Sequence, residues 1–201
     1  MKKIFIAVLS FFMLLSNVSN AAIDEIKATD FVKKVVKEGI EEIIDSNVSQ
    51  KEKVDRFRTL FNKDLDLDFI GKFVLGRYWR TSTPEQRDAF IAAYRELNVK
   101  TWSGRFDDFT GKDFVFHGTT PSNNADQLFV NSSVDMGQGQ QPAKVIWRVK
   151  QNDDSFKVVD IIIENVSLAI TARNEYAAFI KKAPGGVDDL IKNLQAKTKD
   201  N

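Results

Sequence analysis

Side chains that could do chemistry are few and widely separated in this sequence. It contains a single histidine, His117, and no cysteine, which excludes a Cys–His nucleophile. A Ser–His–Asp triad would have to include His117, yet no G-x-S-x-G motif accompanies it, and its alternating context is typical of the outer face of a strand. Asp64, Asp66 and Asp68 lack the glycine and distal glutamate of an EF-hand loop, and aspartates are favoured where helices begin. The sequence therefore predicts no catalytic site and no metal site.

The first residues, 1–21, have the pattern of a secretory signal peptide. A basic start precedes the apolar run 4–15, and Ser19 and Ala21 supply the small residues before a cleavage site. The apolar run is too short to span a bilayer, which takes roughly 20 residues. We expect cleavage after Ala21, export to the periplasm of a Gram-negative cell, and a mature chain that forms one domain over residues 22–201.

Composition narrows the class of partner. The chain is 43% apolar and 28% charged, as is usual for a folded soluble protein. Its formal net charge of +1 falls to −1 without the signal peptide, which carries two lysines and no acidic residue. A nearly neutral chain lacks the positive surplus of a nucleic-acid binder, so nucleic acid is not expected as a partner.

Helical periodicity dominates the first half of the mature chain. Apolar residues recur at helical spacing over residues 26–44, a second helix begins near Ser49, and a third ends near Gly76. The residues TPEQ at 83–86 form a capping box with proline at the first helical position. The helix that they open is expected to run to about Phe109.

After Gly111 the apolar pattern changes to a period of two. Turn-rich segments separate alternating runs, which lie at residues 114–117, 128–136, 145–150 and 156–163. Two further helices, at about 168–182 and 187–197, close the chain. The order of elements predicts a single α+β domain, in which several helices pack on a four-stranded antiparallel sheet.

The fourth strand is apolar on both of its faces. In the segment DIII, Ile161 and Ile163 point to one side and Ile162 to the other, whereas a half-buried strand would alternate apolar with polar residues. The pattern alone slightly favours helices over both faces and a fully packed interior. The alternative is that one face meets packed helices and the other lines a cavity.

Three segments of the sequence resemble the toluene-tolerance, or MlaC, family of periplasmic phospholipid-binding proteins. They are LGRYW at 75–79, the pattern D-I-x-x-E-x-V-S-L at 160–168, and G-x-D-x-L-I at 186–191. The likeness spans essentially the whole mature chain. One departure is Asn165, where members of the family commonly have glycine; asparagine tolerates a left-handed backbone, so the fold expectation stands.

The resemblance implies a soluble, monomeric carrier with an apolar lipid pocket between the sheet and its helices. Phospholipid would be its cargo, with no cofactor. The implied partners are an inner-membrane Mla-type ABC transporter complex with an MCE-domain component and an outer-membrane lipoprotein–porin complex, and the implied role is to maintain outer-membrane lipid asymmetry.

The predicted lipid-contacting residues are large apolar side chains on the inward faces of these elements, although each could equally be an ordinary core residue. They are Phe73, Val74, Tyr94, Trp102, Phe106, Val130, Val134, Trp147, Val159, Ile161, Ile163, Leu168 and Tyr176. Arginines can give a phosphate charge-assisted hydrogen bonds, and the candidates, each also compatible with an ordinary surface role, are Arg77, Arg105, Arg148 and Arg173.

Two other functions stay open on the sequence. Small α+β folds with a helix-covered curved sheet also house isomerases and dehydratases, and such an enzyme would need His117, Asp160 and Tyr78 to converge. A carrier or chaperone for the acyl groups of lipoproteins is the second alternative.

Overall fold

The computed structural model describes residues 23–137, 139, 141–153 and 155–199. The predicted signal peptide lies outside these residues. No helix among those described is both long and apolar enough to span a membrane. The helices are α1 (Glu25–Lys37), the π-helix η1 (Glu38–Ile44), α2 (Gln50–Asp64), α3 (Leu67–Leu75), α4 (Arg77–Thr81), α5 (Pro84–Ser103), the 3₁₀-helix η2 (Phe106–Asp108), α6 (Leu168–Lys182) and α7 (Val187–Lys199).

The predicted capping box is confirmed, but two predicted helices differ in extent. The Thr83 hydroxyl accepts from the Gln86 N–H, and the Gln86 side chain accepts from the Thr83 N–H. The helix that begins there was expected to run to about Phe109 but ends at Ser103. Gly104, a poor helix former, follows its last residue. The single helix expected over residues 26–44 is α-helical to Lys37 and then widens into the π-helix η1.

The sheet is antiparallel, with strands in the order β1-β2-β3-β4-β5. The predicted runs are confirmed as β1 (Phe114–Pro121), β2 (Gln127–Val134), β3 (Ala143–Asn152) and β4 (Ser155–Ile163). A fifth strand, β5 (Val166–Ser167), has only two residues and pairs with the end of β4. Asn165 holds the turn before it at a φ of 66°, the left-handed conformation that asparagine tolerates.

Two β-bulges change which residues share a face of the sheet. In β1 the register shifts between Phe116 and Gly118. In the pairing of β3 with β4, Arg148 opposes Asp160 but Val149 opposes Val158, so that the extra residue Val159 has no partner. Strand parity read from the sequence is therefore correct only on one side of each bulge.

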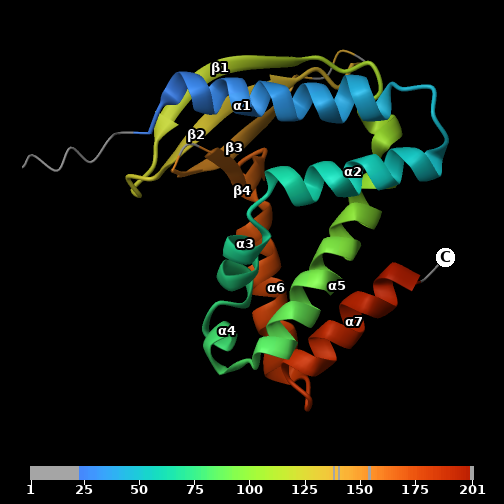
Figure 1. Ribbon diagram of the computed structural model, residues 1–201, viewed down its shortest axis with the longest axis vertical. Helices are drawn as coiled ribbons and strands as arrows, with labels where there is room; N and C mark the ends of the chain where they lie inside the picture. Colours follow the sequence, from blue (N-terminus) through green and yellow to red (C-terminus); the bar gives the residue numbers. More distant parts are fainter. Residues whose placement is uncertain (1–22, 138, 140, 154, 200–201) are drawn as a thin grey trace, which may run out of the picture.

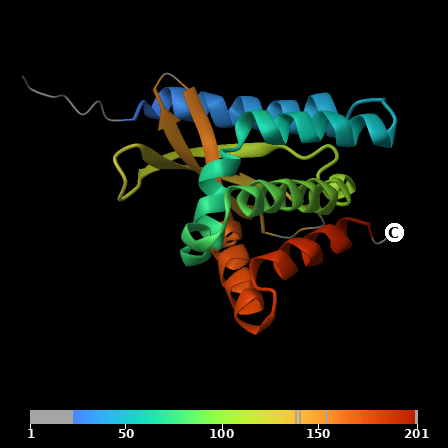
Figure 2. The same cartoon turned by 60° about the horizontal axis from the view of Figure 1, so that its bottom comes forward.

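The elements form two regions that differ in packing (Figures 1 and 2). The sheet half consists of the sheet, α1 across one of its faces, η1 and α2. The helical half consists of α3, α4, α6, α7 and most of α5, and it extends away from one end of the sheet. In the sheet half, Ala28 and Val32 of α1 pack on Leu128, Val130 and Val149.

The helical half has a core of its own, centred on three aromatic rings. Phe90 is fully buried, and its ring stacks with that of Tyr94 at 5.8 Å and meets Tyr176 edge-on at 6.0 Å between centroids. Burial raises the pKa of the Tyr176 hydroxyl to about 12, and it raises the pKa of Tyr94 further. Both phenols are therefore held in the neutral form.

Gly76 joins α3 to α4 at a point where a side chain would not fit. Its backbone has φ 55° and ψ −119°, a conformation that residues with a Cβ avoid. A Cβ built there would also lie 3.1 Å from the guanidinium of Arg173. Arg173 in turn donates to the carbonyl oxygen of Phe73 at 3.1 Å, so this arginine ties α6 to the end of α3.

Candidate functional site

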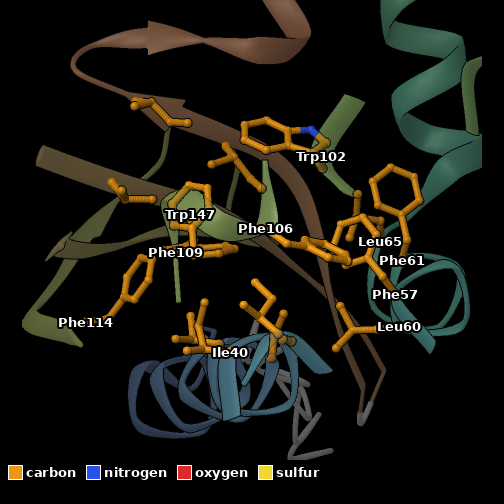
Figure 3. A pocket seen from close by; sticks show the side chains of 17 residues that line it. Ile40, Phe57, Leu60, Phe61, Leu65, Trp102, Phe106, Phe109, Phe114 and Trp147 are labelled. Atoms are coloured by element: carbon orange, nitrogen blue, oxygen red, sulfur yellow. The ribbon is translucent and has the colours of Figure 1, made fainter. Parts of the chain in front are cut away.

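An apolar cavity of about 160 Å³ lies between the inner face of the sheet and the helices that cover it (Figure 3). All 17 side chains or glycines that line it are apolar or aromatic. They come from α1 and η1, from α2 and the residue that follows it, from the end of α5 with η2, and from β1, β3 and β4. The lining residues are Val35, Val36, Gly39, Ile40, Ile44, Phe57, Leu60, Phe61, Leu65, Trp102, Phe106, Phe109, Phe114, Val145, Trp147, Ile161 and Ile163.

The floor of the cavity is a block of paired strand residues. Val145 lies opposite Ile163, and Trp147 lies opposite Ile161, so the four side chains share one face of the sheet. Ile162 points to the opposite face. In the segment DIII, the face that carries Ile161 and Ile163 therefore lines the cavity.

The indole of Trp147 presents its ring to the cavity while its polar atom is satisfied elsewhere. Its Nε1 donates to the hydroxyl of Ser132 at 3.0 Å, and that hydroxyl donates to the carbonyl oxygen of Val145 at 2.8 Å. Ser132 is fully buried. Because both polar groups have partners, the cavity wall stays free of unsatisfied donors.

Aromatic rings gather at two sides of the cavity (Figure 3). On one side the ring of Phe57 meets that of Phe106 edge-on at 5.3 Å and lies 6.1 Å from that of Phe61. On the other side the ring of Phe114 lies 6.3 Å from that of Trp147. These rigid groups hold much of the wall in place without filling the space between them.

The π-helix η1 supplies the wall opposite the sheet. Gly39 has no atom within 4 Å of where its Cβ would be, so this position faces open space. Polar contacts hold η1 to α2: Lys63 pairs with Glu38, and Lys53 donates to the carbonyl oxygen of Ile44. The hydrogen bond from Lys63 lowers the pKa of Glu38. π-helical turns are frequent at functional sites, and η1 lies in the wall of this candidate site.

Part of the predicted lipid-contacting set lies in this wall. Those residues are Trp102, Phe106, Trp147, Ile161 and Ile163. Their contact with lipid stays a prediction, but the structure brings them together from α5, η2, β3 and β4.

The other predicted wall residues lie elsewhere. Phe73, Val74, Tyr94 and Tyr176 pack in the core of the helical half, because the inward faces of α3, α5 and α6 meet one another. Val130 is buried under α1, and Val134 is buried at the end of β2 outside the cavity wall. Val159 is the bulge residue of β4, and with Leu168 it lines a smaller hollow.

Each candidate headgroup arginine has a protein partner. The guanidinium of Arg105 is 5.9 Å from the ring of Trp102, a lining residue, and it pairs with Asp108 at 3.0 Å. Arg148 stacks over Phe129, Arg77 over Tyr78 and Arg173 over Phe73. None of the four lines the cavity, and phosphate binding by them stays a prediction.

The residues that an enzyme would need are not brought together. His117 is exposed on β1, where its Nε2 lies 2.8 Å from the Ser133 hydroxyl. Asp160 is buried on β4, three strands away or about 14 Å by strand spacing, and it accepts from Ser167 and from the Ala169 N–H. Tyr78 belongs to α4 in the helical half. His117, Asp160 and Tyr78 therefore do not form the site that the isomerase-type hypothesis requires.

The prediction from sequence missed twelve of the 17 lining residues. The missed residues are Val35, Val36, Gly39, Ile40 and Ile44 of α1 and η1, Phe57, Leu60, Phe61 and Leu65 around α2, and Phe109, Phe114 and Val145. The broad apolar stripe over residues 26–44 was a signal for burial, and a stripe does not distinguish a packed surface from a hollow one.

The two comparisons by sequence agree on one family, and a solved structure shares the fold. The family model described as MlaC protein matches residues 33–196. The chain is 24% identical over 161 residues to the intermembrane phospholipid transport system binding protein MlaC of Haemophilus influenzae, covering 76% of this chain and 73% of that protein. A solved phospholipid-binding protein from Ralstonia solanacearum, in complex with a phospholipid, superposes with a TM-score of 0.74 at 23% identity, over 85% of this chain and 96% of that one. The structural likeness shows the shared fold.

Proposed function

The chain belongs to the MlaC protein family, and from that premise we propose that it is a carrier that holds diacyl phospholipid with its acyl chains in the apolar cavity. The observation that supports this function is the cavity itself, whose 17 lining residues are all apolar or aromatic. A wall of this kind offers nothing to an ionic or hydrogen-bonding substrate and matches hydrocarbon.

The physics of transfer explains what such a carrier would contribute. Each methylene removed from water is worth roughly 0.8 kcal/mol, so two acyl chains in water would cost on the order of 20 kcal/mol. Spontaneous passage across an aqueous compartment is then negligible. A cavity that resembles the bilayer interior makes exchange with a membrane nearly isoenergetic, and the partners at each end set the direction.

Lipid loading requires the cavity to widen. An engineered cavity of about 150 Å³ in another protein holds one benzene molecule, so 160 Å³ accommodates only part of one acyl chain. Gly39, whose Cβ position faces open space, and the polar contacts between η1 and α2 lie on the side opposite the sheet. We place the widening there, with the sheet as the fixed wall.

The proposed setting is the periplasm. The signal-peptide pattern at the start of the chain supports export. The named relative from Haemophilus influenzae is the binding protein of an intermembrane phospholipid transport system. We propose that this chain works as a monomer between an inner-membrane Mla-type ABC transporter complex with an MCE-domain component and an outer-membrane lipoprotein–porin complex, and so maintains outer-membrane lipid asymmetry.

The test uses two substitutions on neighbouring residues of one strand. Ile161→Glu places a carboxylate in the cavity, whereas Ile162→Glu places the same group on the opposite face of β4. Native mass spectrometry of protein purified without added lipid should detect phospholipid on the wild type and on Ile162→Glu, and none on Ile161→Glu. Circular dichroism establishes that both variants fold.

The other outcomes separate the competing functions. Wild-type protein that carries no phospholipid, either as purified or after incubation with vesicles, contradicts the proposal. A bound acylated lipoprotein peptide would favour the lipoprotein carrier instead. Phospholipid retained by a folded Ile161→Glu variant would show that the lipid lies elsewhere in the molecule.

A further inference from the structure

A second, smaller hollow lies behind one wall of the apolar cavity. It measures about 40 Å³ and lies between the end of α2, the middle of α5, β4 and the start of α6. The two hollows share some of their lining: Phe61, Leu65, Trp102 and Ile161. We call these four residues the partition. In Figure 3, Trp102 lies across from Leu65 and Phe61 at one side of the cavity.

The two sides of the partition differ in chemistry. Behind it, the lining includes the polar residues Asp160 and Asn98, together with Tyr94. Asp160 is only 7% exposed and accepts hydrogen bonds from the Ser167 hydroxyl at 2.5 Å and the Ala169 N–H at 3.0 Å. Hydrocarbon pressed against this carboxylate would remove its remaining access to water without replacing the hydrogen bonds. The partition therefore separates a space that suits an acyl chain from one that does not.

The partition is also held in place mechanically. Trp102 belongs to the last turn of α5, and the guanidinium of Arg105 lies 5.9 Å from its ring. Phe61 is only 6% exposed, and its ring packs on that of Phe57. A terminal methyl group that reaches these two side chains meets rings that are already packed against residues of α2 and the end of α5.

We propose that the partition limits how deeply an acyl chain enters, so that Trp102 and Phe61 set the acyl-chain length that the protein prefers. This inference rests on the proposed function, since it assumes that an acyl chain occupies the cavity. Until a chain reaches the partition, each added methylene is buried and should tighten binding about fourfold. Beyond that length further methylenes stay in water or force a bend, and affinity should stop rising.

The experiment measures binding along a homologous series of saturated lysophosphatidylglycerols below their micellar concentrations. Dissociation constants are obtained by displacement of a fluorescent fatty acid from the full mature protein. For the wild type, affinity should rise roughly 15-fold with each pair of methylenes and then level off at a definite chain length. The variants Trp102→Leu and Phe61→Leu each replace a large ring of the partition by a smaller side chain. In these variants, affinity should stop rising at a longer acyl chain than in the wild type.

Trp79→Leu is the matched control. Trp79 is a half-buried tryptophan of the helical half, with the guanidinium of Arg87 at 5.2 Å from its ring, and it lines neither hollow. This variant should level off at the wild-type length. If Trp102→Leu does not fold, Phe61→Leu, which removes less volume, provides the test.

The results separate the inference from the function on which it rests. Wild-type protein that binds no member of the series contradicts the carrier function. Wild-type protein that binds with no levelling, or that levels at a length unchanged in the folded partition variants, overturns the inference and leaves the carrier function standing. A shift in Trp79→Leu equal to that in Trp102→Leu would also overturn it, because the effect would not be specific to the partition.

Discussion

The helical half and the cavity region are built from the same kinds of side chain but are packed differently. In the helical half, aromatic rings of α5 and α6 interlock around Phe90, which is fully buried. In the cavity region, rings from α2, η2 and the sheet meet only at the edges of an empty space. Helices that pack on each other can interdigitate ridge into groove, whereas η1, the sheet and several bulky rings surround a cavity. Hydrophobic composition thus determines burial, and the geometry of the elements determines whether the interior is full.

Helix α5 connects the two regions. Its first half carries Phe90 and Tyr94 into the solid core, and its last turn carries Trp102 to the cavity. The fixed side of the cavity is therefore anchored on a core that loading does not need to disturb. The covering side is held differently: α1 packs on the sheet, and α2 packs on α5 through Phe61 and Val99. The predictions below test this division, in order of decreasing effect.

Truncating a ring should cost much more stability in the solid core than at the cavity. Phe90→Ala removes a fully buried ring and should lower the free energy of unfolding by about 3–5 kcal/mol. Phe109→Ala removes a half-buried ring that already faces empty space, so it should cost at most about half as much. Urea denaturation of lipid-free protein measures both values. Equal losses would mean that the cavity is filled in solution and that the comparison fails.

Alkaline pH should weaken the molecule through the solid core. The pKa of Tyr176 is about 12 in the folded protein against 10.0 in the unfolded chain, because burial disfavours the phenolate. Its contribution to stability is complete below pH 10 and is lost as pH rises from 10 to 12, by about 2 kcal/mol. Tyr94, whose pKa burial also raises, adds a loss of the same sign.

The variant Tyr176→Phe isolates this contribution. Between pH 9 and 12, tested by urea denaturation, it should lose about 2 kcal/mol less stability than the wild type does. Its lipid binding at neutral pH should be unchanged, since Tyr176 does not line the cavity. An alkaline loss identical to that of the wild type would show that the phenol is accessible to water.

Bound lipid should stabilise the two regions unequally. With free phospholipid at ten times its dissociation constant, states that open the cavity are disfavoured by about 1.4 kcal/mol, a tenfold effect. Amide hydrogens of α1, η1 and α2 that exchange by local opening should slow by that factor, and those at the contact of α5 with α7 should not. Hydrogen exchange with and without lipid measures this. Uniform slowing throughout would mean that loading does not distinguish the regions.

The fold could be predicted well because its signals are local. The TPEQ capping box at 83–86, the change of period after Gly111 and the turn-rich segments each depend on neighbouring residues. The π-helical widening at Glu38 and the end of α5 at Ser103 were not predicted, since helical periodicity is too coarse to separate them from a continuous α-helix.

The cavity could be predicted only in part, for two physical reasons. The β4 bulge removes Val159 from the face of Ile161 and Ile163, and nothing in an alternating pattern marks a bulge. Tyr94 and Tyr176 are inward-facing, as predicted, but what they face is another helix. Periodicity identifies the side of an element that is buried, whereas the partner on that side depends on tertiary arrangement.

The smallest expected effect concerns the start of α5, which joins both regions. Thr83→Ala removes the hydroxyl that caps the Gln86 N–H and should cost about 1 kcal/mol of stability. Because Trp102 lies near the opposite end of a helix roughly 30 Å long, lipid affinity should not change. Thr83→Ser, which keeps the capping oxygen, should restore most of the stability. If Thr83→Ala weakened lipid binding while Thr83→Ser did not, α5 would transmit strain from the solid core to the cavity, and the two regions could not be treated as independent.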